Sequence, residues 1–292
     1  MGNSLITGTV LPLFERERIL TALTLLAFGF AGVILAVAAA RGSWSVPPEG
    51  RLLDAFKFEV GVGIYFLTLA LLVPLAGMSP RALRRWIAWT TAIALYFIPI
   101  ETVQAVRGLD PRFTVAGGTA DQVAGALFGL TAVMVVILFA ILARRFFRND
   151  VLADNPPLRA AIRYGILAIT FAFGTGLVMS ALRTRFIADT GNLMPLHAVG
   201  FHGIQAVPLV ALLAGASGLA LSVRMRLTHV AGIAWLIMCI ALLAQALSGE
   251  SLLDVKPAAI AGALALAVWA ACLIFAGARY VRRSSSALSN SW

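Results

Sequence analysis

Ionisable and amide side chains occur in three apolar segments of the sequence, near one end of each segment. Carboxylates and histidines of this kind transfer protons and bind metals near neutral pH. A charged group inside a membrane costs about 2.5–3.5 kcal/mol on insertion scales, so such groups are functional candidates. The set consists of Lys57 and Glu59 in the first segment, Glu101, Gln104 and Arg107 in the second, and His197, His202 and Gln205 in the third.

Glu101 is the acid whose environment needs the most explanation. Gln104 follows it at i+3 and shares its helix face. If Glu101 is buried, it must pair with a cation or carry a proton, and Lys57 and Arg107 are the available cations. A structural ion pair and a catalytic acid or base both remain open for Glu101. The long side chain of Lys57 also allows its ammonium group to reach the membrane surface.

The two histidines lie five positions apart, about 140° around an ideal helix. They therefore lack the i, i+4 spacing that binds a metal from one helix face. Two histidines on one helix cannot bind opposite sides of one haem, but Pro195 and Gly200 permit an irregular first turn. One histidine together with Glu101 or Glu59 gives better metal geometry. His202 and Gln205, at i and i+3, share a face.

These observations give a predicted set of roles. The predicted catalytic residues are His202, Glu101 and Lys57, the predicted ligand-binding residues are Gln104, Arg107, Gln205 and Glu59, and the predicted metal ligands are His202, His197 and Glu101. The cofactor would be a metal ion or haem. Pro99 and Pro208 break helical hydrogen bonds beside these positions. Such breaks are tolerated at membrane depth beside protein or a wet cavity, which favours a cavity open to the outside.

The composition requires that lipid surrounds most of these segments. Of 292 residues, 60% are hydrophobic and only 12% are charged, against about 25% in soluble proteins. The net charge of +10 arises from arginines at the ends of apolar segments, which is typical of topology signals and predicts no nucleic-acid partner. Cys239 and Cys272 lie inside apolar segments and are expected to be buried small hydrophobes.

Eight segments are long enough to cross a membrane as helices. They span approximately residues 19–40, 53–77, 82–106, 121–143, 158–182, 195–222, 228–248 and 257–279. Fifteen of the 23 lysines and arginines fall on one side, which predicts that both termini are cytoplasmic. We expect an all-α, multi-pass protein of the bacterial inner membrane, with one domain over residues 1–292. The first segment exceeds a signal-peptide core of 7–15 residues and is expected to remain uncleaved.

The sequence shows no convincing internal repeat. Pro156 and Pro157 would separate two halves of four spans each, and both halves would have the same orientation. An inverted-repeat transporter is therefore not indicated. Trp86 and Trp89 follow Arg84 and Arg85, as residues of a membrane-interface belt do.

Three motifs of the chain are similar to an uncharacterised family of bacterial polytopic membrane proteins. The motifs are Lys57-Phe58, then Glu101, Gln104 and Arg107-Gly108, then His197, His202, Gln205 and Pro208-Leu209. The resemblance covers roughly residues 50–215. That family has Ser-His-Phe-Asn after the Arg-Gly, where this chain has Pro111-Arg112-Phe113-Thr114. The resemblance supports the polar set but implies no reaction.

Three classes of function remain open. The first is a periplasm-facing polar pocket between the second, third and sixth spans that binds a small ligand, metal or haem, in a membrane enzyme or sensor. The second is a transporter or channel for a small neutral or lipid-like solute, although proton coupling usually leaves ionisable groups near the midplane. The third is a structural subunit of a membrane complex. The sequence does not define the oligomeric state.

Overall fold

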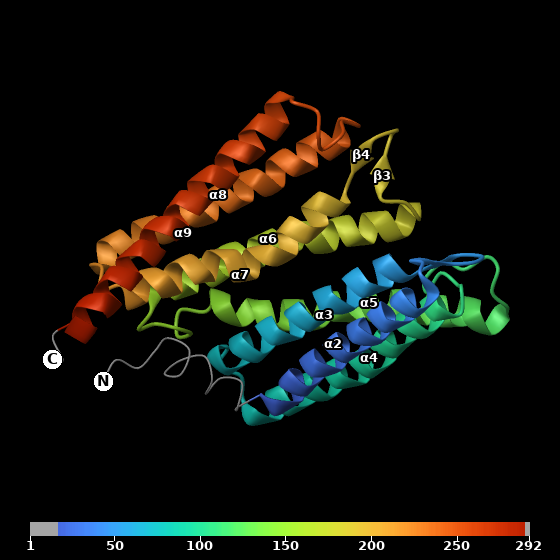
Figure 1. Ribbon diagram of the computed structural model, residues 1–292. Coiled ribbons are helices and arrows are strands. Elements are labelled where there is room, and N and C mark those ends of the chain that lie inside the picture. The colour runs from blue at the N-terminus through green and yellow to red at the C-terminus, as the bar shows by residue number, and fades with distance from the viewer. Residues whose placement is uncertain (1–16, 290–292) are drawn as a thin grey trace. The chain divides into compact units, whose positions relative to one another are not determined.

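The computed structural model describes the backbone of residues 17–289 and the side chains of residues 17–285 (Figure 1). Eight helices in this part of the chain are long and apolar enough to cross a membrane. They are α2 (Arg18–Arg41), α3 (Leu52–Leu72) with η2 (Val73–Leu75), α4 (Pro80–Val106), α5 (Thr119–Ala143) with η3 (Arg144–Phe147), α6 (Pro156–Leu182), α7 (Met194–Ala216), α8 (Leu221–Leu247) and α9 (Pro257–Ser289). The predicted all-α, eight-span class is confirmed.

One pair of predicted boundaries is wrong. The sixth span was expected to reach residue 222 and the seventh to begin at 228, whereas α7 ends at Ala216 and α8 begins at Leu221. The chain reverses at Gly218, whose φ of 72° is in the left-handed region that glycine adopts readily. Arg224 and Arg226 therefore lie in the first two turns of α8 rather than in a loop.

The chain divides into two compact units, with the boundary between Arg145 and Phe146. In the first unit, α2 packs on α3 and α4, and α5 packs on α4. A short antiparallel hairpin, β1 (Ser45–Val46) and β2 (Gly50–Arg51), joins α2 to α3. The stripe of buried residues on α3 recurs every three or four positions, as expected of a helix with one packed face. It comprises Leu52, Ala55, Glu59, Gly63 and Phe66.

The second unit has the same order of elements. Helix α6 packs on α7 and α8, and α9 packs on α8 and α7. The hairpin of β3 (Phe186–Ile187) and β4 (Gly191–Asn192) joins α6 to α7. Its apolar core includes Ala168, Leu196, Val207 and Cys239, each of which is buried. Cys272 is also buried, so both cysteines lie where they were expected.

The two units form an internal repeat, contrary to our expectation from the sequence. Each runs helix, hairpin, helix, helix, helix, and equivalent positions are 141 residues apart (45 and 186, 50 and 191, 77 and 218, 108 and 249). Both α4 and α8 have 27 residues. The hairpin registers also match, because Val46 pairs with Gly50 and Ile187 pairs with Gly191.

The same backbone contacts fix the hairpin in each unit. A Cβ atom on Gly50 would overlap the carbonyl oxygen of Ala105, and a Cβ atom on Gly191 would overlap that of Ala246. A glycine of positive φ follows the end of the third helix in each unit, Gly108 after α4 and Gly249 after α8. The close contact therefore requires glycine at both hairpins.

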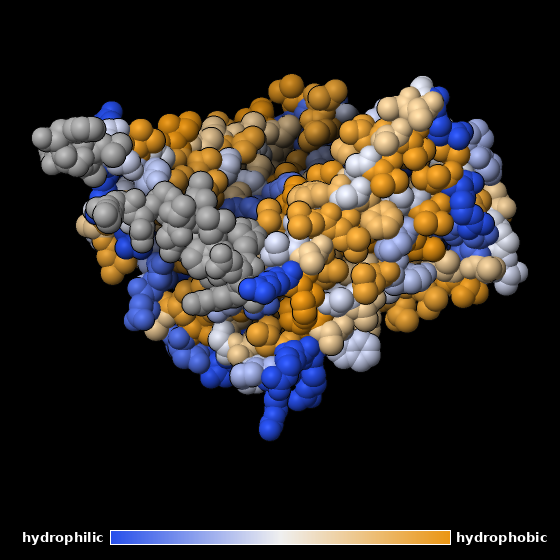
Figure 2. All heavy atoms as spheres, turned by 60° about the horizontal axis from the view of Figure 1, so that its bottom comes forward, coloured by the Kyte–Doolittle hydropathy of each residue, from blue (hydrophilic) through white to orange (hydrophobic). Residues whose placement is uncertain are grey.

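Apolar side chains cover much of the face seen in Figure 2, which suits contact with lipid chains. Many large apolar side chains on the helices are exposed, among them Leu25, Leu130, Ile240, Leu264 and Ile274. The chain is thus a multi-pass membrane protein. Its predicted orientation, its bacterial inner-membrane location and a single domain over residues 1–292 stay predictions.

Candidate functional site

A largely buried set of polar residues lies where α3 begins and α4 ends in the first unit, and it is here named the outer cluster after the side of the membrane on which we predict it to lie. Its members are Glu59, Glu101, Thr102 and Arg112. Glu59 belongs to the buried stripe of α3 and is wholly inaccessible to solvent (0%). The Thr102 hydroxyl donates a hydrogen bond of 3.1 Å to Oε1 of Glu59. The other carboxylate oxygen of Glu59, Oε2, has no hydrogen-bond partner among the described residues.

Glu101 pairs with Arg112, at 2.8 Å between Oε2 and Nη2. The Glu101 side chain is buried, and the guanidinium group of Arg112 lies 5.2 Å from the ring centre of Phe58 and 4.9 Å from that of Phe128. Both separations fall within cation–π range. We expected Glu101 either to pair with a cation or to carry a proton, and it pairs with a cation. The expected partners, Lys57 and Arg107, are wrong, because the partner is Arg112.

The loop after α4 positions Arg112. Oδ1 of Asp110 accepts hydrogen bonds of 2.8 Å from the backbone N–H groups of Arg112 and Phe113. This turn directs the chain back toward the end of α4, which no spacing within a span could indicate. Lys57, by contrast, is exposed on α3.

Gln104 and Arg107 form a second polar contact with the start of α5. Arg107 donates to Oδ1 of Asp121 and to Oε1 of Gln104, each at 2.6 Å. Gln104 is buried and donates to the same Asp121 oxygen at 3.1 Å. These two predicted ligand-binding residues therefore join α4 to α5.

Glu49, in the first hairpin, is a residue that sequence reasoning missed. Its carboxylate accepts a hydrogen bond from the Thr114 hydroxyl and others of 2.8 and 3.0 Å from the backbone N–H groups of Val115 and Ala116. The Thr114 hydroxyl, followed by the Val115 N–H, lowers the pKa of Glu49 to about 2. Glu49 thus attaches the hairpin to the loop that carries Arg112.

The predicted histidines lie in the second unit. Nδ1 of His197 is 2.8 Å from the Ala172 carbonyl oxygen, and the His197 ring packs edge-on against Phe201 at 4.9 Å. His202 is exposed, and its Nδ1 lies 3.1 Å from Oε1 of Gln205. The shared face expected for His202 and Gln205 is confirmed.

The predicted site residues thus fall into two groups. Glu59, Glu101, Gln104 and Arg107 lie at one end of the first unit, while the histidines and Gln205 belong to the second. A meeting of His202 with Glu101 stays a prediction. Among residues 17–285, no three His, Cys, Asp or Glu side chains form a group that could hold a metal ion. Metal or haem binding therefore also stays a prediction.

Comparisons with known proteins found no matching family model, curated protein or solved structure. The resemblance of the three motifs to an uncharacterised family stays a prediction. The geometry of the first unit is thus the basis for a functional proposal.

Proposed function

We propose that the outer cluster binds a proton at Glu59, and that the protein is a proton-responsive sensor or enzyme of the bacterial inner membrane. The observation that carries this proposal is the Oε2 atom of Glu59, which is buried without a donor. Burying an ionised carboxylate without full pairing costs several kcal/mol. A bound proton removes that cost.

The burial of Glu59 favours a proton over any larger ligand. A residue with no accessible surface leaves no room for a larger ligand without rearrangement, whereas a proton occupies no cavity. Thr102 donates a hydrogen bond to Oε1, so a proton stabilises the buried carboxyl group most when it binds to Oε2. A protonated Oε2 would itself become a hydrogen-bond donor.

Arg112 argues against a metal ion at the outer cluster. Its guanidinium group already neutralises Glu101 at 2.8 Å, and a metal ion bound there would face this positive charge. Haem would further need an axial ligand such as histidine. The outer cluster alone therefore favours proton exchange, with Glu101 and Arg112 as the connection to water.

Exchange with the outside is supported by the exposure of Arg112, whose side chain is 32% accessible, against 1% for Glu101. Thr102 adjoins Glu101 along α4 and contacts Glu59. Protons would pass between water and Glu59 along this short path, on the side that we predict to be periplasmic.

The internal repeat favours a second candidate, a transporter of a small neutral or lipid-like solute. Parallel repeats of equal topology occur in secondary transporters, and the two units here share their order of elements. In such a transporter, protonation of Glu59 would be coupled to movement of the solute. This candidate predicts passage of protons through the protein, whereas a sensor predicts exchange with one side only.

The test uses full-length protein reconstituted in uniform orientation into vesicles, with one pH indicator outside and another trapped inside. After a jump of the outside medium to alkaline pH, wild-type protein should release about one proton per chain more than Glu59→Gln. Glu49→Gln is the matched control, because Glu49 is already ionised, and it should release as many protons as wild type. Equal release by wild type and Glu59→Gln would contradict proton binding at Glu59. A proton-dependent response of the trapped indicator would favour the transporter.

A further inference from the structure

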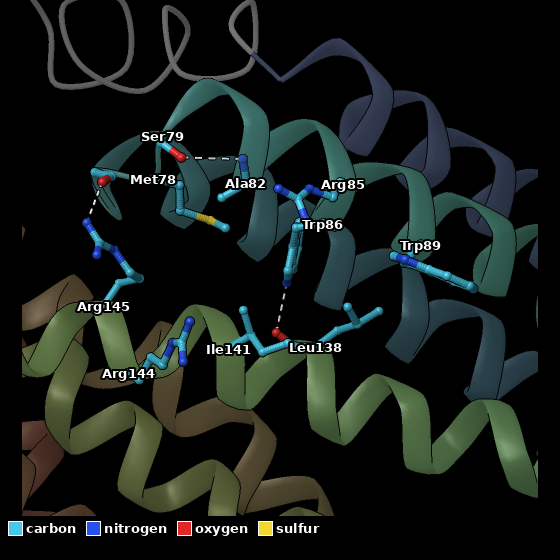
Figure 3. Close-up of a pocket in the computed structure, with 11 residues that line it drawn as sticks. Met78, Ser79, Ala82, Arg85, Trp86, Trp89, Leu138, Ile141, Arg144 and Arg145 are labelled. Atoms are coloured by element: carbon cyan, nitrogen blue, oxygen red, sulfur yellow. Dashed lines mark hydrogen bonds between the residues drawn. The ribbon is translucent and has the colours of Figure 1, made fainter.

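A cavity of about 560 Å³ lies between the start of α4 and the end of α5, at the opposite end of α4 from Glu101 (Figure 3). It is a separate site from the outer cluster, because about 24 Å of helix separates Arg85 from Glu101 at 1.5 Å per residue. The lining residues come from these helices and from the turn before α4. They are Gly77, Met78, Ser79, Ala82, Arg85, Trp86, Trp89, Leu138, Ile141, Arg144 and Arg145.

Three arginines and no acidic residue of the described chain line this cavity. Arg145 is engaged by the protein, since its Nε donates to the Ala76 carbonyl oxygen at 3.1 Å and its Nη2 donates to that of Gly77. Arg85 and Arg144 are exposed and have no ion pair among the described residues. Figure 3 shows the Arg144 side chain pointing into the space between the two helices.

The remaining wall is aromatic and apolar. The indole N–H of Trp86 donates to the Leu138 carbonyl oxygen at 2.8 Å, which fixes this ring between α4 and α5. Trp89, one turn further along α4, is 62% exposed. A second, much smaller cavity of about 10 Å³ lies on the α4–α5 side of Trp86 and Leu138, which line both spaces.

We propose that this cavity binds the headgroup phosphate of an anionic phospholipid. Guanidinium groups form paired hydrogen bonds with phosphate oxygens. Basic pockets between transmembrane helices bind anionic lipid headgroups, and tryptophan favours the headgroup level of a bilayer. Arg85 and Arg144 would hold the phosphate, and Trp86 with Ile141 would contact the glycerol and the first carbons of the acyl chains.

A lipid fits better than free phosphate, because much of the wall is apolar and the cavity is larger than a phosphate ion needs. The outer face of α5 also continues the apolar wall away from the cavity. Leu130, Val133 and Ile137 precede Ile141 at spacings of three or four residues, and all three are exposed. A lipid bound through its phosphate could lay an acyl chain along this face.

The experiment measures binding of phosphatidylglycerol to full-length protein in neutral detergent by native mass spectrometry. Wild type should bind one phosphatidylglycerol in preference to phosphatidylcholine. The double variant Arg85→Gln with Arg144→Gln should bind phosphatidylglycerol about 30-fold more weakly, since losing the hydrogen bonds of each arginine to the phosphate weakens binding by about a factor of five. Both arginines are exposed, so the fold should be retained.

Two further variants distinguish lipid binding in this cavity from nonspecific attraction of the lipid by positive charge on the surface. Arg84→Gln is the matched control, because Arg84 is exposed beside Arg85 but does not line the cavity, and it should bind within about threefold of wild type. Ala82→Trp keeps every charge but fills the cavity, and it should lose the preference for phosphatidylglycerol.

Three results would overturn the proposal. The first is equal binding of phosphatidylglycerol and phosphatidylcholine by wild type. The second is equal loss of binding in Arg84→Gln and in the double variant. The third is complete displacement of the lipid by millimolar inorganic phosphate, which would identify the free ion as the ligand. None of these results depends on proton binding at Glu59.

Discussion

The pair of Glu101 and Arg112 holds together the loop after α4 and the C-terminal end of that helix. Glu101 is 1% exposed, and the guanidinium group of its partner lies over the rings of Phe58 and Phe128. Removing one partner of such a pair leaves an uncompensated buried charge, which costs more than the pair itself contributes.

Arg112→Gln should therefore lower the free energy of unfolding by about 3 kcal/mol. The measurement is a denaturant titration in mixed micelles. Arg51→Gln is the matched control, because Arg51 and Asp54 form an exposed pair at 2.9 Å and should contribute less than about 0.5 kcal/mol. Adding Glu101→Gln to Arg112→Gln should recover most of the loss. An Arg112→Gln protein as stable as Arg51→Gln would show that the pair is not buried.

At this scale the sequence predicted the need for a partner but not its identity. Glu101 was recognisable as an acid at membrane depth, so a nearby cation or a proton was required. Arg112 lies in the loop after α4. It reaches Glu101 because the chain turns at Asp110 and because hydrogen bonds attach this loop to Glu49. Such contacts join residues that are far apart in sequence, so the periodicity of a helix does not predict them.

The helices themselves were predictable, because the thickness of the bilayer sets the length of each apolar segment and arginines lie at the ends of these segments. The two hairpins and the repeat were not, because only single residues and short runs, such as Ala70-Leu71-Leu72 and Ala211-Leu212-Leu213, recur at the interval of 141 positions. Gly50 and Gly191 recur, as do Gln104 and Gln245. What the two units share is backbone geometry, and side-chain chemistry has diverged. Glu59, for example, is replaced at the equivalent position by Gly200.

The hairpin contact provides a test at the scale of the element. Gly50→Ala and Gly191→Ala should each lower the free energy of unfolding by about 2 kcal/mol or more, because the new methyl group overlaps a carbonyl oxygen of the third helix. Gly61→Ala is the control: no atom lies within 4 Å of its added Cβ, and it should be neutral or stabilise α3 by up to about 1 kcal/mol. A Gly191→Ala protein with wild-type stability would rule out the shared contact.

For the whole molecule, four spans per unit predict that both hairpins lie on the same side of the membrane. Ser45→Cys and Asp189→Cys should react with a membrane-impermeant maleimide in intact spheroplasts. Asn149→Cys, in the loop between α5 and α6, should react only after permeabilisation. Cys239 and Cys272 are buried and should give little background. Labelling of Ser45→Cys and Asp189→Cys from opposite sides would contradict the eight-span topology.

Infrared spectroscopy of protein labelled with ¹³C-glutamate tests the proton on Glu59 most directly. In nanodiscs near neutral pH, wild-type protein and Glu49→Gln should both show the C=O stretch of a protonated glutamate, shifted by the label. The band should be absent from Glu59→Gln. A wild-type spectrum without this band, or a band of equal strength in Glu59→Gln, would contradict the account.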